Sequence, residues 1–492
     1  MERFLIADIA AVRQSLWWAL LVLVAGLVLF SQTWAWYGDE GFHLLTSQLI
    51  NAGKRPYLDF VYPQTPLYAY LDAGWMWLLS DTWRSSHALS ALLTGGSIIL
   101  AAGFVLKRLP QLEWQLSAAL LTAILFGLNS LVIRFGTIGQ PYGTCLFLIV
   151  ASFRLIINAT TESRTALFLW AGVCAGASAG CSLLCAPVVP TLLAWTAWRS
   201  VKEERLRKCA WLLLGTVISF LPMFWLAVLG PRQTLFNTFE YHFFYRADSN
   251  WAAVRDNLKV LTEVLNSNQF LLLIVFAAAG LLFVVGRSQW GTRERAEFYL
   301  CGWLAAALAI FLSTVRFTFH QYFVLLSPFL SILSSVGIMA IASCLRAPGR
   351  PAWLIPGVLL LYMAGLPWWL WQQHRQLHWS QLEEVARAVN RVTPEGGSVW
   401  ADEGIYFAAR RIPPSGLEHS DSHRLRLSPD YAAEMHVVSR PDLYAWVAAG
   451  RFETVASCWA TDDWIDSSGL RKVYAERTTV HGCDIFWSKI SR

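Results

Sequence analysis

The chain has 492 residues, of which 55% are hydrophobic and only 15% are charged, and it contains 26 tryptophans. A soluble domain carries roughly 25% charged residues, so the composition predicts a polytopic membrane protein with a smaller soluble part. The formal net charge of +6 is small for this length. It indicates loop charges that set membrane topology and argues against a nucleic-acid partner.

The first apolar segment, residues 16–36, has the length of a membrane-spanning helix and no small-residue cleavage site after it. This favours a retained helix over a signal peptide. Further apolar segments follow along the chain, and the pair at 165–198 is short and interrupted by Gly and Pro, as in re-entrant helices. The predicted fold is a polytopic α-helical membrane protein with eleven spans, at 16–36, 84–106, 114–133, 142–157, 165–180, 182–198, 209–229, 269–286, 297–314, 321–344 and 353–372.

Basic residues in the loops orient these spans. If the N-terminus, with Arg3 and Arg13, is cytoplasmic, every short basic loop falls on the cytoplasmic side, as the positive-inside rule requires. The sequence therefore predicts a multi-pass protein of the plasma (inner) membrane with an extracytoplasmic C-terminus. Three longer polar segments then lie on the outer face, at residues 37–83, 230–268 and 373–492.

The first outer segment opens with two adjacent acids, Asp39 and Glu40. Such a pair is either a hydrated loop start or part of a site at the membrane edge. Desolvation near the hydrocarbon raises the proton affinity of a carboxylate, which suits a general base. The following stretches "FHLLTSQLINAG" and "YAYLDAGWMWLLS" have helical spacing and interfacial aromatics. They predict two amphipathic helices that lie flat in the interface and roof the acids.

A site for a lipid-linked phosphate also needs cations on the outer face. Snorkelling at a helix end is the alternative explanation for each cation, but all of them fall on the side of the acid pair. The candidates for binding donor phosphate or substrate are His242, Tyr245 and Arg246 in "NTFEYHFFYRADSNW", Arg316, His320 and Tyr322 in "STVRFTFHQYF", and Arg134 in "IRFGTIGQPYG".

The last outer segment, residues 373–492, predicts a small α/β domain. A strand follows "TPEGGS", a helix and a strand follow in "DLYAWVAAGRFETVASCWA", and a strand pair follows in "RKVYAERTTVHGCDIFWSKI". The absence of a phosphate-binding Gly loop indicates a lid or a binding module. Before these, "SQLEEVARAVNRV" predicts a helix with one apolar face, made of Leu382, Val385, Ala386 and Val389.

Two of the nine cysteines, Cys458 and Cys483, lie in this polar segment, and the others lie in apolar runs as small hydrophobic residues. An extracytoplasmic location would allow these two cysteines to form a disulfide. Whether they do stays open at this point, because their sequence separation does not determine the distance between them.

Several motifs are excluded or explained otherwise. "GASAG" at 176–180 matches the GxSxG nucleophile elbow, but an elbow needs a strand before it. Its apolar flanks instead favour small residues at a helix–helix contact. The chain has no Walker motif, no GxGxxG and no HExxH, so neither an ATP-driven machine nor a Rossmann-type nucleotide-sugar enzyme is expected.

These features together resemble the GT-C superfamily of integral-membrane glycosyltransferases. Within it, the chain is most similar to bacterial relatives of protein O-mannosyltransferases and of lipid A aminoarabinose transferases. The acid pair opens the first outer loop, "RFTFHQY" occupies a late outer loop, and the number of helices and the outer C-terminal domain fit. The specific stretch continues as "G..PY.DF…P…PL", here Gly53, Pro56, Tyr57, Asp59, Phe60, Pro63 and Pro66.

The resemblance implies inverting transfer of a sugar from a polyprenyl-phosphate donor to a hydroxyl of a lipid, glycan or protein acceptor, on the extracytoplasmic face. Asp39 is then the general base, Glu40 supports it, and cations neutralise the departing phosphate. Residues 1–372 form the transmembrane catalytic module and 373–492 the outer domain. The first-loop candidates for substrate binding are Tyr62, Gln64 and Asp59.

"GQPYG" replaces an acidic turn that many relatives carry after the third span, so substrate contacts there are in doubt. A divalent metal stays open as a cofactor, because the spacing of His43 and Asp59 is not diagnostic of a ligand set. The alternative function is a non-enzymatic transporter or flippase of lipid-linked sugars. It predicts paired repeats and charges at mid-membrane depth, and the sequence shows no convincing repeat and almost no mid-span acids.

Overall fold

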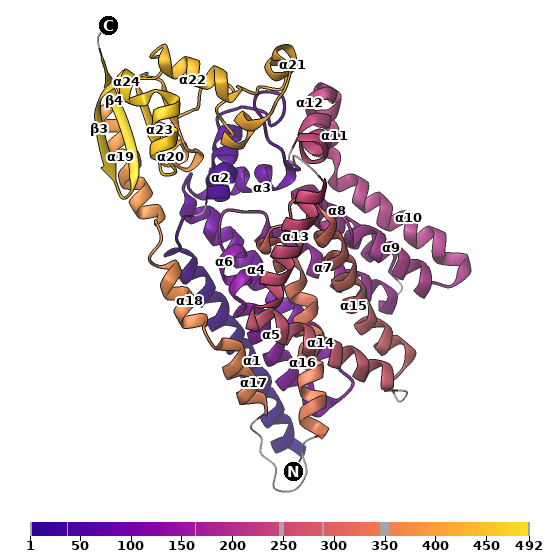
Figure 1. Ribbon diagram of the computed structural model, residues 1–492. Helices are drawn as coiled ribbons and strands as arrows, with labels where there is room; N and C mark the ends of the chain where they lie inside the picture. Colours follow the sequence, from indigo (N-terminus) through magenta and orange to yellow (C-terminus); the bar gives the residue numbers. More distant parts are fainter. Residues whose placement is uncertain are drawn as a thin grey trace. The chain divides into compact units, whose positions relative to one another are not determined.

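The computed structural model describes residues 2–36, 38–162, 164–245, 250–287, 290–344 and 354–490. The chain folds into two compact units, and each is built from three pieces of sequence (Figure 1). The first unit contains Met1–Gln32, His87–Leu221 and Ser249–Leu370, and the second contains Thr33–Ser86, Pro222–Asp248 and Trp371–Arg492.

The described residues of the first unit form helices. Among the described residues, seven helices are long and apolar enough to cross a membrane, or eight if α10 and α11 form one bent span. The helices that lie wholly or mainly in this unit are α1 (Glu2–Ser31), α4 (Trp83–Arg108), η1 (Leu112–Trp114), α5 (Gln115–Gly127), α6 (Ser130–Phe135), α7 (Tyr142–Glu162), α8 (Thr165–Cys181), η2 (Leu183–Cys185), α9 (Val188–Arg199), α10 (Lys202–Ser219), α13 (Asn250–Leu265), α14 (Asn268–Gly286), α15 (Thr292–Thr314), η4 (His320–Leu326), α16 (Ser327–Cys344), α17 (Leu354–Met363) and α18 (Leu366–Gln373).

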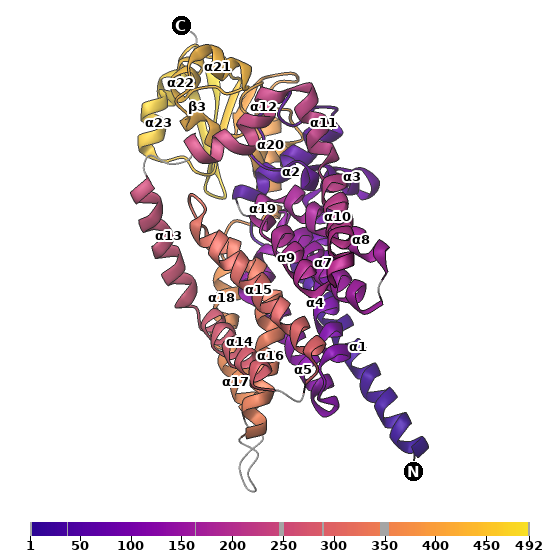
Figure 2. The ribbon, with the colours of Figure 1, turned by 90° about the vertical axis from the view of Figure 1, so that its right-hand side faces the viewer.

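Burial separates the central helix of this unit from the peripheral ones. In the candidate span His320–Cys344, 94% of the apolar window is buried, whereas only 22% is buried in Gln14–Ser31. The helix α16 is therefore the core of the unit and packs against α14, which lies beside it in Figure 2. The outward apolar side chains of α1 are those expected of a helix that faces lipid.

Small residues bring α8 and α10 into backbone contact. A Cβ atom on Gly172 would lie 2.0 Å from the carbonyl oxygen of Leu212, and one on Gly215 would lie 2.1 Å from that of Leu169. The "GASAG" stretch lies near the end of α8 with helix before it, and a Cβ atom on its Gly176 would lie 2.7 Å from the carbonyl oxygen of Thr216 in α10. The structure thus excludes a nucleophile elbow here and confirms a helix–helix contact made by small residues.

The second unit combines helices from all three of its sequence pieces. The first two pieces supply α2 (Gly38–Asn51), α3 (Leu67–Leu79), α11 (Leu221–Leu229), α12 (Pro231–Leu235) and the π-helix η3 (Phe236–Tyr245). The C-terminal piece supplies α19 (Trp379–Val392), α20 (Glu403–Ala409), η5 (Ser420–Arg424), α21 (Pro429–Glu434), α22 (Arg440–Ala448), α23 (Asp462–Ser468) and α24 (Leu470–Val473).

A four-stranded sheet lies in the C-terminal piece, at the positions predicted for strands. Its order is β1 (Val399–Ala401), β2 (Thr454–Ser457), β4 (Cys483–Lys489), β3 (Tyr474–Val480). The strands β1 and β2 are parallel, and the other two pairs are antiparallel. The hairpin between β3 and β4 turns at His481 and Gly482, which both have positive φ, as a two-residue type I′ turn requires.

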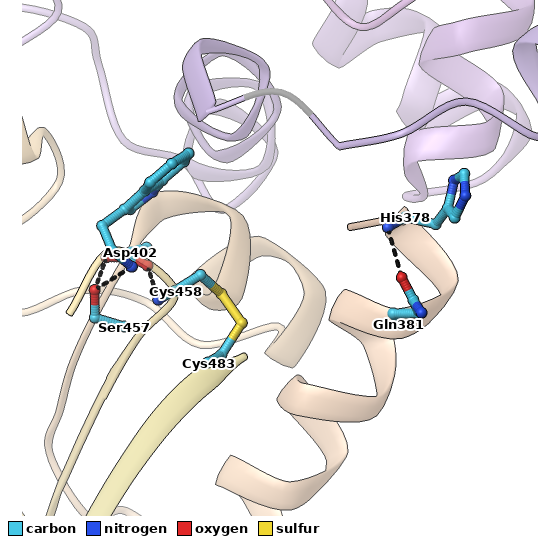
Figure 3. The surroundings of a disulfide bond; sticks show 7 residues. His378, Gln381, Asp402, Ser457, Cys458 and Cys483 are labelled. Carbon is cyan, nitrogen blue, oxygen red and sulfur yellow. Dashed lines mark hydrogen bonds between the residues drawn. A yellow bond between two sulfur atoms is a disulfide. The ribbon is translucent and has the colours of Figure 1, made fainter. Parts of the chain in front are cut away.

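The two cysteines of the C-terminal piece form a disulfide. Cys458, just after β2, is bonded to Cys483 at the start of β4 (Figure 3). Beside it, the carboxylate of Asp402 accepts hydrogen bonds from the backbone N–H of Cys458 at 2.6 Å and from the Ser457 hydroxyl at 3.0 Å. The disulfide thus fixes the end of β2 to the start of β4, and the Asp402 carboxylate fixes it to the start of α20.

The helix α2 is enclosed on two sides. It packs against α3 on one side and against α20 on the other, and most of its residues are buried. Residues of α19, such as Leu382, Val385 and Val389, belong to the same hydrophobic core, which confirms the apolar face predicted for that helix. That α2 lies flat in the membrane interface stays a prediction, but α2 has no open face there of the kind its spacing suggests, because the C-terminal piece covers it.

Candidate active site

The predicted acid pair lies in the first turn of α2, and its two members have different surroundings. Asp39 is exposed, whereas Glu40 is fully buried. The N-terminal end of a helix stabilises negative charge at both positions. Asp39 is thus the exposed acid of the pair, and Glu40 is part of the protein interior.

Glu40 is held by the C-terminal piece of the chain. Its Oε2 accepts a hydrogen bond from the indole N–H of Trp379 at 2.9 Å. At the next residue, α2 and α20 meet backbone to backbone, because a Cβ atom on Gly41 would lie 2.6 Å from the amide nitrogen of Gly404. The position of Asp39 therefore depends on residues more than three hundred positions away in the sequence.

His43 lies one helical turn after Asp39 on the same face of α2. Its Nδ1 is 3.4 Å from the hydroxyl oxygen of Tyr62, and its ring packs edge-on against Tyr68. Burial, with a smaller contribution from His419, lowers the pKa of His43 to about 3. The imidazole is neutral at physiological pH, so it can share a hydrogen bond with Tyr62 but offers no charge to a phosphate.

A carboxylate–imidazole pair that sequence reasoning missed lies against α2. His419 Nδ1 is 3.8 Å from Glu403 Oε1, and the His419 ring packs on Phe42 with centroids 4.4 Å apart. The Glu403 carboxylate also accepts hydrogen bonds from the backbone N–H and hydroxyl of Ser420. Burial would raise the pKa of Glu403, but His419 and the Ser420 N–H hold it below its ordinary value.

One sequence signal could have found this pair. The tripeptide Asp-Glu-Gly occurs twice in the chain, at 39–41 and at 402–404. Each copy lies at the start of a helix, α2 or α20, and the glycine of one copy contacts the glycine of the other. The structure thus places two acidic helix starts side by side.

The first-loop candidates serve the fold of the loop. Tyr62 is fully buried and its backbone N–H donates to Asn237 Oδ1 at 2.8 Å. The carbonyl oxygen of Gln64 accepts a hydrogen bond from Tyr57 at 2.5 Å. Asp59 forms a two-pronged ion pair with Arg55, which lowers the pKa of the Asp59 carboxyl.

The second outer segment meets this region through His242 and Tyr241. The Nε2 atom of His242 is 2.8 Å from the carbonyl oxygen of Pro63. The hydroxyl oxygen of Tyr241, another residue that sequence reasoning missed, is 3.5 Å from His419 Nε2. The side chain of Tyr245 and the whole of Arg246 lie outside the described residues.

The remaining candidates belong to the first unit. Two of them, Arg134 and His320, contact the ring of Phe135. The Arg134 guanidinium carbon lies 5.2 Å from the centre of the Phe135 ring, and the His320 ring lies 5.6 Å from it. Tyr322 is buried and packs edge-on against Phe319. Arg316 is half-buried in the turn before η4.

The described residues contain no group of three or more His, Cys, Asp or Glu side chains that could hold a metal ion. The two ligands considered from the sequence have different partners, since His43 faces Tyr62 and Asp59 is bound to Arg55.

No protein-family model and no curated protein sequence matches this chain. Solved structures do match it, and they establish its fold. The chain has the fold of the GT-C glycosyltransferases, as the sequence resemblance predicted, and it is an integral membrane protein.

Among the matching structures is ArnT from Cupriavidus metallidurans bound to undecaprenyl phosphate, with a TM-score of 0.69 and 14% identity over 95% of this chain and 97% of that chain. ArnT in the apo state matches with a TM-score of 0.66 and 16% identity over 96% and 97%. The Archaeoglobus fulgidus oligosaccharyltransferase tethered with an acceptor peptide matches with a TM-score of 0.53 and 12% identity over 94% and 72%. At these identities the likeness establishes the fold.

Proposed function

We propose that the chain transfers a sugar from a polyprenyl-phosphate-linked donor to an acceptor hydroxyl on the extracytoplasmic face, with inversion. The observation that carries this proposal is the fold likeness to ArnT bound to undecaprenyl phosphate, which extends over 95% of the chain. The acid pair supports it, because one carboxylate is exposed to a substrate while its neighbour is fixed in the interior.

In the proposed reaction Asp39 is the general base. It takes the proton of the acceptor hydroxyl while the hydroxyl oxygen attacks the anomeric carbon. The bond from that carbon to the phosphate oxygen breaks, and polyprenyl phosphate leaves with the electron pair. A single displacement of this kind inverts the anomeric centre. Glu40, bonded to Trp379, would hold the first turn of α2 in place.

Cations would stabilise the departing phosphate, which then needs no proton donor. We assign this role to Arg316, His320, Arg134 and Arg246, with Tyr322 and Tyr245 as hydrogen-bonding neighbours. In the first loop and in η3, His242, Tyr62, Gln64 and Asp59 would shape the substrate site. His242 bonds to the carbonyl oxygen of Pro63, and the backbone N–H of Gln64 donates to the carbonyl oxygen of Tyr62. The sugar would come from the donor lipid, and the acceptor would be a lipid, a glycan or a protein.

The topology is also part of the proposal. If α10 and α11 form one span and the three shorter apolar helices also cross the membrane, the described helices give the predicted eleven spans. An odd number places the two termini on opposite sides. The Cys458–Cys483 disulfide supports an extracytoplasmic C-terminal α/β domain, because disulfides persist in oxidising compartments.

The test is transfer of labelled sugar from polyprenyl phosphate donors in reconstituted vesicles. Asp39→Asn should lower the rate by at least about 10²-fold. The matched control is Asp463→Asn, another exposed aspartate in the first turn of a helix, which should keep the wild-type rate. Full activity in Asp39→Asn would remove Asp39 as the base. Movement of lipid-linked sugar across the vesicle without transfer would favour a flippase.

A further inference from the structure

The second outer segment carries large apolar side chains that the proposed chemistry does not use. They occur along α11, α12 and η3, which follow one another with only Gly230 between α11 and α12. The exposed residues of α11 are Leu221, Phe224, Trp225, Val228 and Leu229. The exposed large apolar residues of α12 and η3 are Leu235, Phe239, Phe243 and Phe244. We call these four side chains the phenyl surface.

The π-helical geometry of η3 sorts this segment into two faces. In a π-helix each hydrogen bond spans five residues, so side chains four or five positions apart lie above one another. Phe239, Phe243 and Phe244 are 44%, 54% and 66% exposed, and Phe239 stacks on Phe243 with ring centroids 4.3 Å apart. On the other face, Phe236 and Tyr241 are buried in a cluster with residues of the C-terminal piece.

Polar side chains of the same segment bond to the protein. The bonded pairs are Arg232 with Glu434 at 2.8 Å, Glu240 with Tyr431 at 2.5 Å, Asn237 with Tyr62 at 2.8 Å, and His242 with Pro63 at 2.8 Å. The segment therefore directs these polar groups towards the rest of the second unit and leaves the phenyl rings of Phe239, Phe243 and Phe244 on its exposed face. Exposed apolar surfaces of this kind mark contact with a partner or a membrane.

Continuity with α11 identifies the partner. The helices α10 and α11, bent by 52° at their junction, together have the length and composition of a membrane segment, so we expect the exposed apolar residues of α11 to face hydrocarbon. The phenyl surface continues from α11 after a single glycine. Trp225 and Arg232 flank the junction, and these residue types are common at the border between hydrocarbon and headgroups.

We propose that α12 and η3 lie in the lipid–water interface of the bilayer, with the phenyl surface inserted among phospholipid acyl chains. The opposite face of η3 then holds Tyr241 and His242 at headgroup depth. If the proposed function is right, this is the depth at which the phosphate of a lipid-linked donor lies. The lipid contact itself does not depend on that function.

Spin labels on single introduced cysteines test the contact in the full chain. Phe243→Cys and Phe244→Cys are made in a Cys344→Ser background, because Cys344 is an exposed free cysteine. The matched control is Ile412→Cys, since Ile412 is also an exposed apolar residue, 58% exposed, in the C-terminal piece of the second unit. The proteins are placed in vesicles of phosphatidylethanolamine and phosphatidylglycerol, and collisions with oxygen and with a water-soluble nickel chelate are measured.

Labels at 243 and 244 should collide with oxygen severalfold more often than with the chelate, and the label at 412 should show the reverse. Equal access of the chelate to all three positions would overturn the proposal by placing the surface in water. Exclusion of both reagents from 243 and 244 would overturn it too, by showing a protein partner. Lipid contact without sugar transfer by the unlabelled wild type would refute the proposed function alone.

Discussion

Replacing Trp379 with phenylalanine should weaken the second unit through one buried hydrogen bond. Trp379 is fully buried, and its indole N–H lies 2.9 Å from Glu40 Oε2. Phenylalanine keeps an aromatic ring next to Trp83 and Phe407 but donates nothing to Glu40. A hydrogen bond to a charged group contributes about 1.5–3 kcal/mol, and a buried acceptor has no water to replace the lost donor. We expect the free energy of unfolding to fall by this amount, plus the cost of the smaller ring.

Trp83→Phe is the matched control for this change. The Trp83 indole donates to Glu383 Oε1 at 2.7 Å, but the Glu383 side chain is 31% exposed and is also bound by Arg84 at 2.8 Å. Water and Arg84 can replace the lost donor, so the hydrogen-bond part of the cost should be about 1 kcal/mol or less. Thermal unfolding in detergent measures the difference, at about 2–4 °C per kcal/mol for a protein of 150–250 residues. Equal midpoints for the two variants would refute the reasoning about Glu40.

Three further predictions concern the same unit. Gly41→Ala places a Cβ atom 2.6 Å from the backbone of α20 and should cost about 1–3 kcal/mol, whereas Gly74→Ala has open space and should be neutral or stabilising in the same melts. Reducing the Cys458–Cys483 bond opens a loop with a sequence separation of 25 and should cost about 3.5 kcal/mol, so an unchanged midpoint in dithiothreitol would contradict this. Burial raises the pKa of Asp402 to about 7, so its stabilising contribution is complete below about pH 4 and is lost as the pH rises through about 7. Melts of Asp402→Asn should therefore vary less with pH than wild-type melts over that range.

The fold could be predicted where local pattern determines it. Apolar runs of spanning length became helices, and the His481–Gly482 turn between two alternating stretches became a hairpin. The surroundings of α2 could not be predicted in this way. Its spacing is that of an amphipathic interfacial helix, but Gly404 and Trp379 cover it from a distant part of the sequence. Periodicity reveals which face of a helix is apolar and does not reveal which element packs on it.

The candidate site was predictable only in part for the same reason. Two adjacent acids after an apolar run identified Asp39 and Glu40 as candidates. Both side chains are carboxylates, so the sequence does not predict that Asp39 is exposed and Glu40 is buried. His419 stands in a polar stretch without a spacing motif, and its pairing with Glu403 depends on the path of the chain after α20. The roles of Asp39 and the cations stay predictions until transfer is measured.

The hydrogen bond from Trp379 to Glu40 also sets an order of events during synthesis. Its two residues are 339 positions apart in the chain. A ribosome adds about 5–20 residues per second, so roughly 15–70 seconds pass between the synthesis of Glu40 and the synthesis of Trp379. During that time α2 has already been synthesised, but the Glu40 carboxylate has no indole donor. The earliest part of the second unit is thus completed by the last part of the chain, and a nascent chain stopped before Trp379 would carry Asp39 on an unfinished support.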